Sequence, residues 1–598
     1  MMKLSDYVAR FLDQQGLRDI FLVSGGGIMH LLDSVGRQPG LRYWCTYHEQ
    51  AAAIAAEGLA KVTNRPGVCL VTVGPGGVNA LSGVVGAWFD STPMLVLSGQ
   101  VRRNLIADYG KIRQFGPQEA DVVGLARHVT KHAVTVMDPA RIRWELEHAL
   151  HVATHGRPGP VWLDLPLDVQ GALLDPEALE GFQPPPDDPG AQAALEAQVD
   201  QVVAMLQESR RPLLLAGNGI HRAGCETEFL DLVDRTGFPV VLPFSAKDLL
   251  WEDHPGNMGV FGAAGQRRAN FTLQNADLIL SLASGLCVAK AGFATESFAP
   301  RARKILVDID PGQLHDQPIR GELAVQADIG AFLRALLRKL PAGGFRPDPR
   351  WGVACRDWKA RYPALAPEFL AVEDFVNTYV FMDRLAEAMG PDDVLVTGNG
   401  MDIVSHYQAF RVRRGQRTVV TANWGAMGWD LPLAVGACIA RDRRRTVLVT
   451  GDGSVQLNIQ ELLTVSHHRL PVKIFIFNNG GYSSIRATQN AFFQGFYVGA
   501  DATSGVASPD FRALAAAYGM TYRRIPDHRT LATVLAEALA EEGPCLTEVA
   551  VDPAQAISPK ASAFRREDGT FESRPLEDMA PFLPREEVHR NMHLFDAP

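Results

Sequence analysis

The stretch GDGSVQLNIQELLTVSHHRLPVKIFIFNNGG, residues 451–481, decides the fold of this chain. It follows a β-branched run at 446–450, continues through a helical pattern and ends in an apolar run at 472–477. This order predicts one βαβ unit with two parallel strands. Asp452 and Asn479 follow the two strands closely, so we expect both side chains at the carboxyl edge of the sheet, where open α/β sheets bind ligands.

The two loops at this edge predict a magnesium site. Asp452, Asn479 and the backbone carbonyl of Gly481 offer oxygen ligands, which suit a Mg²⁺ ion that takes its remaining ligands from water and phosphates. Gly451 and Gly453 would let the backbone approach a diphosphate at the start of the following helix, where free N–H groups favour anions. The alternative is an ordinary glycine turn in a doubly wound sheet, because GDG alone is a weak signal.

Composition describes a large globular protein. Its 598 residues suffice for several domains, and no apolar run approaches the ~20 residues of a membrane helix. The N-terminal residues 1–16 are amphipathic and lack a signal-peptide core, so we expect a first helix there. The seven cysteines form no Cys-x-x-Cys pair, which favours a cytoplasmic setting over disulfides or structural zinc. A net charge of −9 argues against nucleic acid as a partner.

The N-terminal part alternates strands and helices and offers a second set of candidates. A strand at 19–23 runs into the glycine triplet 25–27, which either admits a ligand or is a flexible turn. A strand at 42–47 leads to Glu49, in the first turn of an alanine-rich helix, where an acid commonly only complements the helix dipole. Because another strand and the glycine turn 74–77 follow, we expect Glu49 at a sheet edge, where a carboxylate needs a partner.

Several longer motifs accompany the βαβ unit. In chain order they are HEQAAAIAAEGLAK (48–61), VTVGPGGVNALSGVVGAWFDSTPMLVLSGQV (71–101), QEADVV (118–123), GRPGPVWLDLPLDVQ (156–170), VDIDP (307–311) and GAMGWDLPLAVGA (425–437). Together with GDGS and the NN pair, they resemble the acetolactate synthase branch of the thiamine diphosphate enzymes over nearly the whole chain.

The resemblance implies an α/β fold of three flavodoxin-like domains, each with a doubly wound parallel sheet. They are a pyrimidine-binding domain at 1–172, a central domain at 194–340 and a diphosphate-binding domain at 372–555, followed by a C-terminal lid at 556–598. Proline-rich passages at 183–193 and 341–350 are expected to be linkers between them. The resemblance also implies active sites between the subunits of a homodimer or homotetramer.

The resemblance assigns roles to individual residues. Glu49 matches the glutamate that bonds N1′ of the aminopyrimidine, Gly425 and Met427 match residues that bond and bend the cofactor, and Gln118 matches a glutamine that lines the pocket. A lone methionine would otherwise be read as core filler. The remaining candidates are Gly26 for catalysis, and Asn79, Gly398, Asn399, Gly451, Asp452, Gly453, Ser454, Asn479, Gly481 and Tyr482 for cofactor binding.

The implied reaction is decarboxylation of a 2-keto acid, such as pyruvate, with transfer of the acetyl unit to a carbonyl acceptor. Thiamine diphosphate would supply a carbanion at C2, with Glu49 as its proton partner. Pro117 and Thr488 stand where related synthases carry aromatic residues, so the acceptor could be a keto acid, aldehyde, ketone or keto-sugar. Arg486 and Gln489 either face that acceptor or pack. The alternatives are a simple decarboxylase, acetolactate synthase proper, or a non-catalytic regulatory protein that keeps the cofactor fold.

The sequence leaves FAD binding by the central domain open. AGNG at 216–219, Gly262, Asp308, Asp310 and Asp328 occupy positions that could contact a dinucleotide, although each is also consistent with a plain strand-end turn. Residues 284–287, SGLC, stand where many flavin-containing relatives place an arginine. The sequence therefore favours equally a central domain that binds FAD and one that does not.

Overall fold

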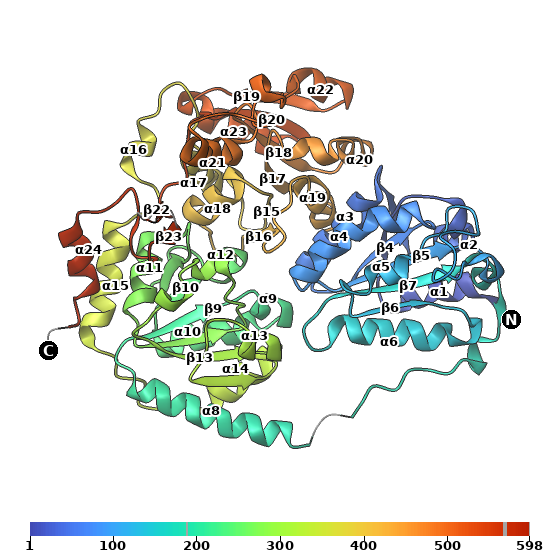
Figure 1. Cartoon of the computed structure of the whole chain (residues 1–598), viewed down its shortest axis with the longest axis horizontal. Coiled ribbons are helices and arrows are strands. Elements are labelled where there is room, and N and C mark those ends of the chain that lie inside the picture. Colours follow the sequence, from blue (N-terminus) through green and yellow to red (C-terminus); the bar gives the residue numbers. More distant parts are fainter. Residues whose placement is uncertain (187–188, 566–567, 569–570, 597–598) are drawn as a thin grey trace.

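The computed structural model describes residues 1–186, 189–565, 568 and 571–596, and it contains three α/β units (Figure 1). Each unit is built on a six-stranded sheet in which every neighbouring pair of strands is parallel. The central strands are almost continuously apolar because helices cover both faces of each sheet. The predicted fold class, three α/β domains with parallel sheets, is confirmed. The exact domain limits stay a prediction.

The first unit reverses its strand order next to the N-terminal glycine turns. Its strands, in sheet order, are β3 (Arg42–Cys45), β2 (Asp19–Leu22), β4 (Gly67–Val71), β5 (Met94–Gln100), β7 (Pro160–Pro166) and β6 (His132–Thr135). Its longer helices are α1 (Leu4–Gln14), α2 (Met29–Arg37), α3 (Glu49–Thr63), α4 (Pro75–Phe89) and α6 (Ile142–Thr154). The order reverses between β2 and β4, and the carboxyl ends of these two strands form the crevice in which such sheets bind ligands.

The middle unit also contains a six-stranded parallel sheet. Its strands, in sheet order, are β11 (Asn257–Val260), β10 (Val240–Leu242), β9 (Pro212–Ala216), β12 (Leu278–Leu282), β13 (Arg303–Asp308) and β14 (Leu323–Gln326). Its longer helices are α8 (Ala191–Glu208), α10 (Glu226–Thr236), α11 (Arg267–Asn275), α14 (Ile329–Lys339) and α15 (Pro349–Arg361).

Two of these helices correct the predicted linkers. Helix α8 begins inside the passage 183–193, and α15 begins inside the passage 341–350. Pro349 was misread as a linker residue, because a proline fits the first position of a helix and the Asp348 side chain caps the Arg350 N–H. Helix α15 buries Trp351 and Trp358 against the middle unit, so it belongs to that unit by packing.

The third unit contains the predicted βαβ stretch. Its strands, in sheet order, are β16 (Arg417–Val420), β15 (Val394–Thr397), β17 (Thr446–Gly451), β18 (Val472–Asn478), β20 (Cys545–Ala550) and β19 (Thr521–Ile525). Its helices include α17 (Thr378–Ala388), α18 (Met401–Ala409), α19 (Asp430–Ile439), α20 (Glu461–His467), α21 (Ser483–Phe493), α22 (Phe511–Ala517) and α23 (His528–Ala540). Strands β17 and β18 pair in parallel from Thr446 opposite Val472 to Gly451 opposite Phe477, as the pattern predicted.

The described part of the C-terminal tail is anchored mainly to the middle unit. Its helix α24 (Arg585–Met592) lies beside α11 and α15 (Figure 1), and Trp358 donates its indole N–H to Asn591 at 3.2 Å. The start of the tail passes closer to the third unit, where the Gln408 side chain donates to the carbonyl of Pro559 at 2.7 Å. A lid role for 556–598 stays a prediction. A helix long and apolar enough for a membrane does not occur among the described residues.

Helices α3 and α19 join the first and third units through direct backbone contact. A Cβ atom on Gly58 would lie 2.3 Å from the carbonyl oxygen of Leu433, and one on Gly436 would lie 1.9 Å from the carbonyl oxygen of Ala55. Only residues without a side chain fit at these two positions. The alanine-rich sequence of α3, read above as an ordinary helix, is thus an interface of small residues.

A buried charge network lies beside this contact. The Lys61 ammonium is 2.8 Å from Glu57 and 2.6 Å from Asp90, and it donates to the backbone carbonyl of Val420 at 2.8 Å. Glu57 also accepts a hydrogen bond from the indole of Trp429 at 2.7 Å. Because Val420 and Trp429 belong to the third unit, the network ties the first unit to it.

Replacing Gly436 with alanine is expected to destabilise the association of these two units. The added methyl group would meet the Ala55 carbonyl at 1.9 Å, so α3 and α19 would have to separate. Overpacking of this kind costs ~1–3 kcal/mol, and a contact with backbone leaves little room for relaxation. Calorimetry should show a lower unfolding temperature.

Gly36→Ala is the matched control. Gly36 also lies within a helix, α2, but a Cβ atom there would meet nothing within 4 Å. Alanine is favoured over glycine in a helix by ~0.5–1 kcal/mol, so this variant should be at least as stable as the parent. Equal unfolding temperatures for the two variants would contradict the close contact of α3 with α19.

Candidate functional site

The turn after β17 holds Asp452 in a buried position against the turn after β18. One carboxylate oxygen of Asp452 accepts hydrogen bonds from the Gly481 N–H at 2.9 Å and from the Ser508 hydroxyl at 2.6 Å. The other accepts from the Gly453 N–H at 3.0 Å. Burial raises the pKa of this carboxyl group, so a nearby cation would stabilise its ionised form. The position suits a ligand of a divalent ion.

Two glycines at this edge are required by close packing. A Cβ atom on Gly453 would lie 2.3 Å from the ring of Tyr482, which covers the GDG turn. Gly481 has a φ of 130°, and a Cβ atom on it would lie 2.5 Å from the carbonyl oxygen of Ala500. At Gly451, by contrast, a Cβ atom would meet nothing within 4 Å. The turn is therefore open on one side, as access for a phosphate would require.

Arg486 of α21 orients Asn479, the second predicted metal ligand. Its guanidinium donates to the side-chain oxygen of Asn479 at 3.1 Å and to the backbone carbonyl of the same residue at 2.9 Å. It also donates to the carbonyl of Ala500 at 3.2 Å, and it is 7% exposed. Gln489 exchanges two hydrogen bonds with the backbone of Val498. Both side chains therefore pack in this structure, which is the second of the two alternatives left open by the sequence.

The loop before α19 is hydrogen-bonded to the loop after β15 and to the GDGS turn after β17. The Asn399 side-chain amide donates to the carbonyl of Gly425, the group that the resemblance assigns to the 4′-amino group of the cofactor. The Gly428 N–H donates to the hydroxyl of Ser454 at 2.9 Å, so Ser454 links this loop to the GDGS turn. Met427 lies between the two ties and is half-buried. Four predicted cofactor residues are thus brought together.

Two buried carboxyl groups lie behind Gly398. The Gly398 N–H donates to Asp402 at 2.8 Å, and a Cβ atom on Gly398 would lie 2.4 Å from Asp430. Burial raises the pKa of Asp402 well above its usual range, and the charge of Asp430 raises it further. Burial also raises the pKa of Asp430. A neutral Asp402 would not repel a diphosphate bound at this edge.

Glu49 begins α3 at the carboxyl edge of the first sheet. Its carboxylate accepts a hydrogen bond from the Asn79 amide at 3.0 Å, which joins two predicted site residues from α3 and α4. The carboxylate also faces the turn before α4, since a Cβ atom on Gly76 would lie 3.5 Å from it. His48 caps the helix by accepting from the Gln50 N–H at 3.1 Å. Glu49 is half-buried at a strand-end turn, as the sequence predicted.

Gly26 and Gln118 approach the same edge from other loops. Gly26 follows β2, and its neighbour Gly27 donates its N–H to the hydroxyl of Thr72 at 3.1 Å. A Cβ atom on Gly26 would meet nothing within 4 Å, so this backbone is accessible. Gln118 is exposed with a φ of 61°, and its carbonyl oxygen closely contacts Gly74. Both residues therefore border the crevice between β2 and β4.

The sequence reasoning missed two residues that hold the candidate side chains in place. The Glu119 carboxylate is buried and accepts from the N–H groups of Ala107 at 2.9 Å and Gly116 at 3.1 Å, which fixes the loop that carries Gln118. The position of Glu119 directly after Gln118 could have suggested a role at the site. Residue type alone, however, does not distinguish a buried acid from a surface acid. Ser508, which donates to Asp452, lies far along the chain and gave no local signal.

Within one chain, a neighbour of Glu49 is hydrogen-bonded to the third unit, whereas none of the hydrogen bonds among the described residues joins the Glu49 side chain to that unit. Asn458 donates to the side chain of Gln50 at 3.2 Å. Among the described residues, the hydrogen bond from Asn79 is the one that the Glu49 side chain makes. No hydrogen bond in that part of the chain links Glu49 to the oxygen ligands around Asp452. Within the described part of a single chain, the two halves of the candidate site are therefore not joined by a direct hydrogen bond.

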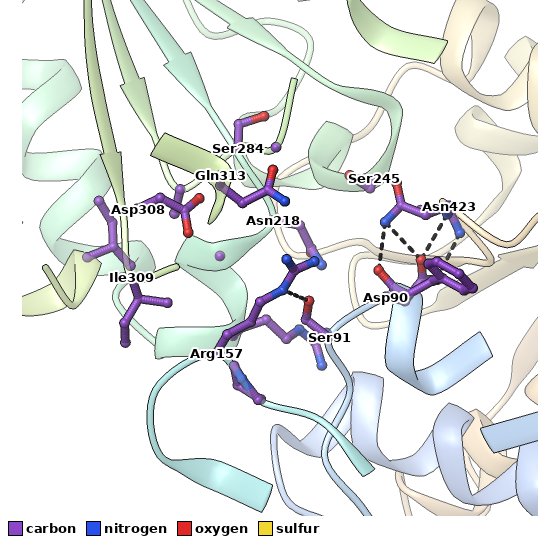
Figure 2. Close-up of a pocket in the computed structure, with 18 of the residues that line it drawn as sticks. Asp90, Ser91, Arg157, Asn218, Ser245, Ser284, Asp308, Ile309, Gln313 and Asn423 are labelled. Carbon is purple, nitrogen blue, oxygen red and sulfur yellow. Dashed lines mark hydrogen bonds between the residues drawn. The ribbon is translucent and has the colours of Figure 1, made fainter. Parts of the chain in front are cut away.

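A cavity of about 630 Å³ lies where the three units meet (Figure 2). Its lining includes Asp90, Ser91 and Arg157 from the first unit, Asn218, Ser284, Asp308 and Gln313 from the middle unit, and Asn423 from the third. Figure 2 shows Arg157 donating to Ser91, at 2.8 Å, on the wall opposite the middle sheet. Positively and negatively charged side chains therefore both line the cavity.

The cavity collects some of the predicted dinucleotide contacts. Asn218, Asp308 and Asp328 line it, whereas Asp310 pairs with Arg157 at 2.7 Å. Gly262 lines a smaller cavity of about 230 Å³, together with Gly398, Asn399 and Gly425 of the third unit. The two cavities share Ala289 and Ala422 in their linings.

Three domain families of thiamine pyrophosphate enzymes match the chain. The N-terminal TPP binding domain matches residues 2–125, the central domain matches 199–336 and the C-terminal TPP binding domain matches 398–549. Each match falls on one of the three α/β units.

Similar known proteins are large subunits of acetolactate synthase. Isozyme 1 from Escherichia coli is 29% identical over 93% of this chain and 95% of its own length. A probable acetolactate synthase large subunit from Methanocaldococcus jannaschii is 30% identical, with 93% of each chain covered. Isozyme 2 from Escherichia coli is 30% identical over 93% of this chain and 97% of its own length.

Proposed function

Because this chain belongs to the thiamine pyrophosphate enzymes and is acetolactate synthase-like, we propose that it decarboxylates pyruvate and transfers the acetyl unit to a carbonyl acceptor. The observation that carries the proposal is the gathering of Asp452, Asn479 and Gly481 at one strand-end edge of the third unit. Ser454, in the same turn as Asp452, accepts from Gly428 in the loop before α19, and Asn399 donates to Gly425 in that loop.

We propose Mg²⁺ as the ion at this edge. The oxygen groups present fit it, because a carboxylate, an amide oxygen and a backbone carbonyl are ligands that a hard cation prefers. The raised pKa of buried Asp452 supports the fit, since burial leaves its charge in need of a cation. Asp452, Asn479 and the Gly481 carbonyl would hold the ion, and the Arg486 contact keeps the Asn479 oxygen oriented. The diphosphate of the cofactor would complete the coordination.

Glu49 would carry the proton chemistry. Thiamine diphosphate, when bound, would supply a nucleophilic carbon and a ring that can store the electrons left after loss of carbon dioxide. Glu49 would share a proton with N1′ of the pyrimidine, and Asn79 keeps the carboxylate oriented through its 3.0 Å hydrogen bond. Met427 would press the pyrimidine toward the reacting carbon, because its loop is fixed at Gly425 and Gly428. Asn79 and Met427 would contribute by positioning groups, whereas the Glu49 carboxyl group would also exchange a proton.

We propose that two chains complete each site. In support, the Glu49 side chain makes no hydrogen bond to the Asp452 region within its own chain, among the described residues. Large apolar side chains after the site are also exposed in a single chain, Phe493 at 62%, Phe496 at 75% and Val498 at 63%. A second subunit would cover such side chains. The minimal assembly is a homodimer, and a homotetramer is a pair of such dimers.

The location and the second substrate are further proposals. All seven cysteines are free in the structure, which fits the predicted cytoplasmic location. The acceptor would bind near Gln118 and α21, where Pro117 and Thr488 are exposed. Neither carries the aromatic ring expected in branched-chain amino-acid synthases, so we favour an aldehyde, ketone or keto-sugar over a second keto acid.

Pyruvate offered with thiamine diphosphate and Mg²⁺ is expected to release carbon dioxide. Mass spectrometry of the products, with a panel of aldehydes, ketones, keto-sugars and keto acids, then identifies the acceptor. Acetolactate alone would identify acetolactate synthase proper, and acetaldehyde alone a simple decarboxylase. No carbon dioxide from any small 2-keto acid, despite bound cofactor, would favour the non-catalytic regulatory protein instead.

Co-expression of Glu49→Gln with Asp452→Ala is expected to restore activity that each variant lacks alone. If sites form between subunits, half of the randomly paired dimers are mixed, and each mixed dimer has one intact site, so about a quarter of the parent activity returns. Activity is measured as carbon dioxide release per chain. If each site lay within one chain, every site in the mixture would lack one residue, and a mixture without activity would contradict the shared site.

We propose FAD as the ligand of the three-unit cavity. Carboxylates of Asp308 and Asp328 could accept from ribose hydroxyls, and the cations Arg157, Arg222 and Lys290 in the lining suit phosphates. The visible spectrum of the purified protein tests this, because bound flavin absorbs there and the polypeptide does not. The parent protein is expected to show flavin absorption, and Asp308→Asn is expected to lose it. A colourless protein that takes up no added FAD would refute the proposal.

A further inference from the structure

Two histidines and a glutamate meet on the first unit, outside all the cavities and site residues described above. His132 begins β6, the edge strand of the first sheet, while Glu145 and His148 lie on α6. One ligand atom from each of the three side chains lies within 4.8 Å of the other two. Residues three positions apart on a helix project from the same face, so α6 presents Glu145 and His148 together toward the start of β6.

His148 has a nitrogen that its surroundings leave unsatisfied. Its Nδ1 atom is buried and has no hydrogen-bond partner among the described residues. A buried polar atom without a partner is unfavourable, and such atoms in native proteins commonly mark a bound water or ion. Burial lowers the pKa of His148, and the neighbouring His132 lowers it further, which favours the neutral imidazole. A neutral imidazole is the form that binds metals.

The surrounding side chains orient these three groups. Trp144 stacks on His148 with ring centroids 4.6 Å apart, and Phe182 packs against the same imidazole at 5.0 Å. One oxygen of Glu145 is 3.9 Å from Arg141, whose guanidinium lies over the Trp144 ring at 4.2 Å. The other oxygen is 3.1 Å from Nε2 of His132. Supports of this kind around a ligand set restrict its geometry, as they do around known metal sites.

We propose that His132, Glu145 and His148 form a binding site for a divalent transition-metal ion such as Zn²⁺, distinct from the Mg²⁺ site. Two imidazole nitrogens and one carboxylate oxygen suit Zn²⁺, Co²⁺ or Ni²⁺, whereas Mg²⁺ prefers oxygen ligands only. Ligands bound at ~2.0–2.2 Å would lie ~3–3.5 Å from one another, so small side-chain movements suffice.

The bound ion would join the edge strand to the helix that covers it. The 3.1 Å contact between His132 and Glu145 already brings β6 and α6 together, and the ion would replace it with bonds to both elements and to His148. His132 is 21% exposed, so water could fill the remaining coordination position. The site would therefore be structural, and its occupancy would not depend on the carboligase activity.

Titration with Ni²⁺ and with Zn²⁺ tests the site. Chelator-treated full-length protein, with Mg²⁺ and thiamine diphosphate present, should bind one Ni²⁺ or Zn²⁺ per chain by calorimetry. Ni²⁺ should also quench the fluorescence of Trp144, because its ring stacks on a ligand, and Trp144→Phe should remove that quenching. His148→Gln, His132→Gln and the near-isosteric Glu145→Gln should each weaken binding about tenfold or more.

Matched controls come from other histidines of the first unit. His128 is exposed, so His128→Gln should bind like the parent. His151 and His155, whose rings stack at 3.7 Å, are the competing chelating pair near the end of α6. No binding by the parent, binding unchanged in His148→Gln, or binding removed by His151→Gln with His148 intact would each overturn the proposal. Far-UV circular dichroism confirms that the variants are folded.

Discussion

The backbones of α3 and α19 touch, and the arrangement of the active-site motifs depends on that contact. Helix α3 begins at Glu49, and α19 directly follows the loop that carries Met427. Because Gly58 and Gly436 let each helix meet a backbone carbonyl of the other, the two elements cannot slide without a clash. The Lys61 network ties the same surfaces by charge. Within one chain, this contact therefore links the start of α3, with Glu49, to the loop that carries Met427.

The third unit must hold an anionic cofactor beside several acids. Asp402, Asp430 and Asp452 are all buried, and burial raises the pKa of each carboxyl group. Left ionised together, they would repel a diphosphate. A neutral Asp402 and a metal ion on Asp452 would remove most of that repulsion.

The middle unit supplies support more than chemistry. It forms most of the three-unit cavity, and it also holds α15 and the described part of the C-terminal tail. The hydrogen bond from the Trp358 indole to Asn591 is one of the contacts that hold the tail against the middle unit. Contacts of this kind also hold α15, which begins at the end of a proline-containing passage that looked like a linker.

The sequence by itself determined the parallel-sheet units and the strand-end positions of Glu49, Asp452 and Asn479, because strand periodicity and glycine turns are local patterns. The resemblance of its longer motifs indicated the family. The sequence also indicated the oxygen ligands at the edge of the third sheet. Only the tertiary structure decided how these groups are held. Arg486 packs against Asn479, and Ser508 bonds Asp452. Glu119 fixes the Gln118 loop. Such partners lie in other loops or are buried. Neither the distance between two residues in the fold nor their burial can be inferred from residue type.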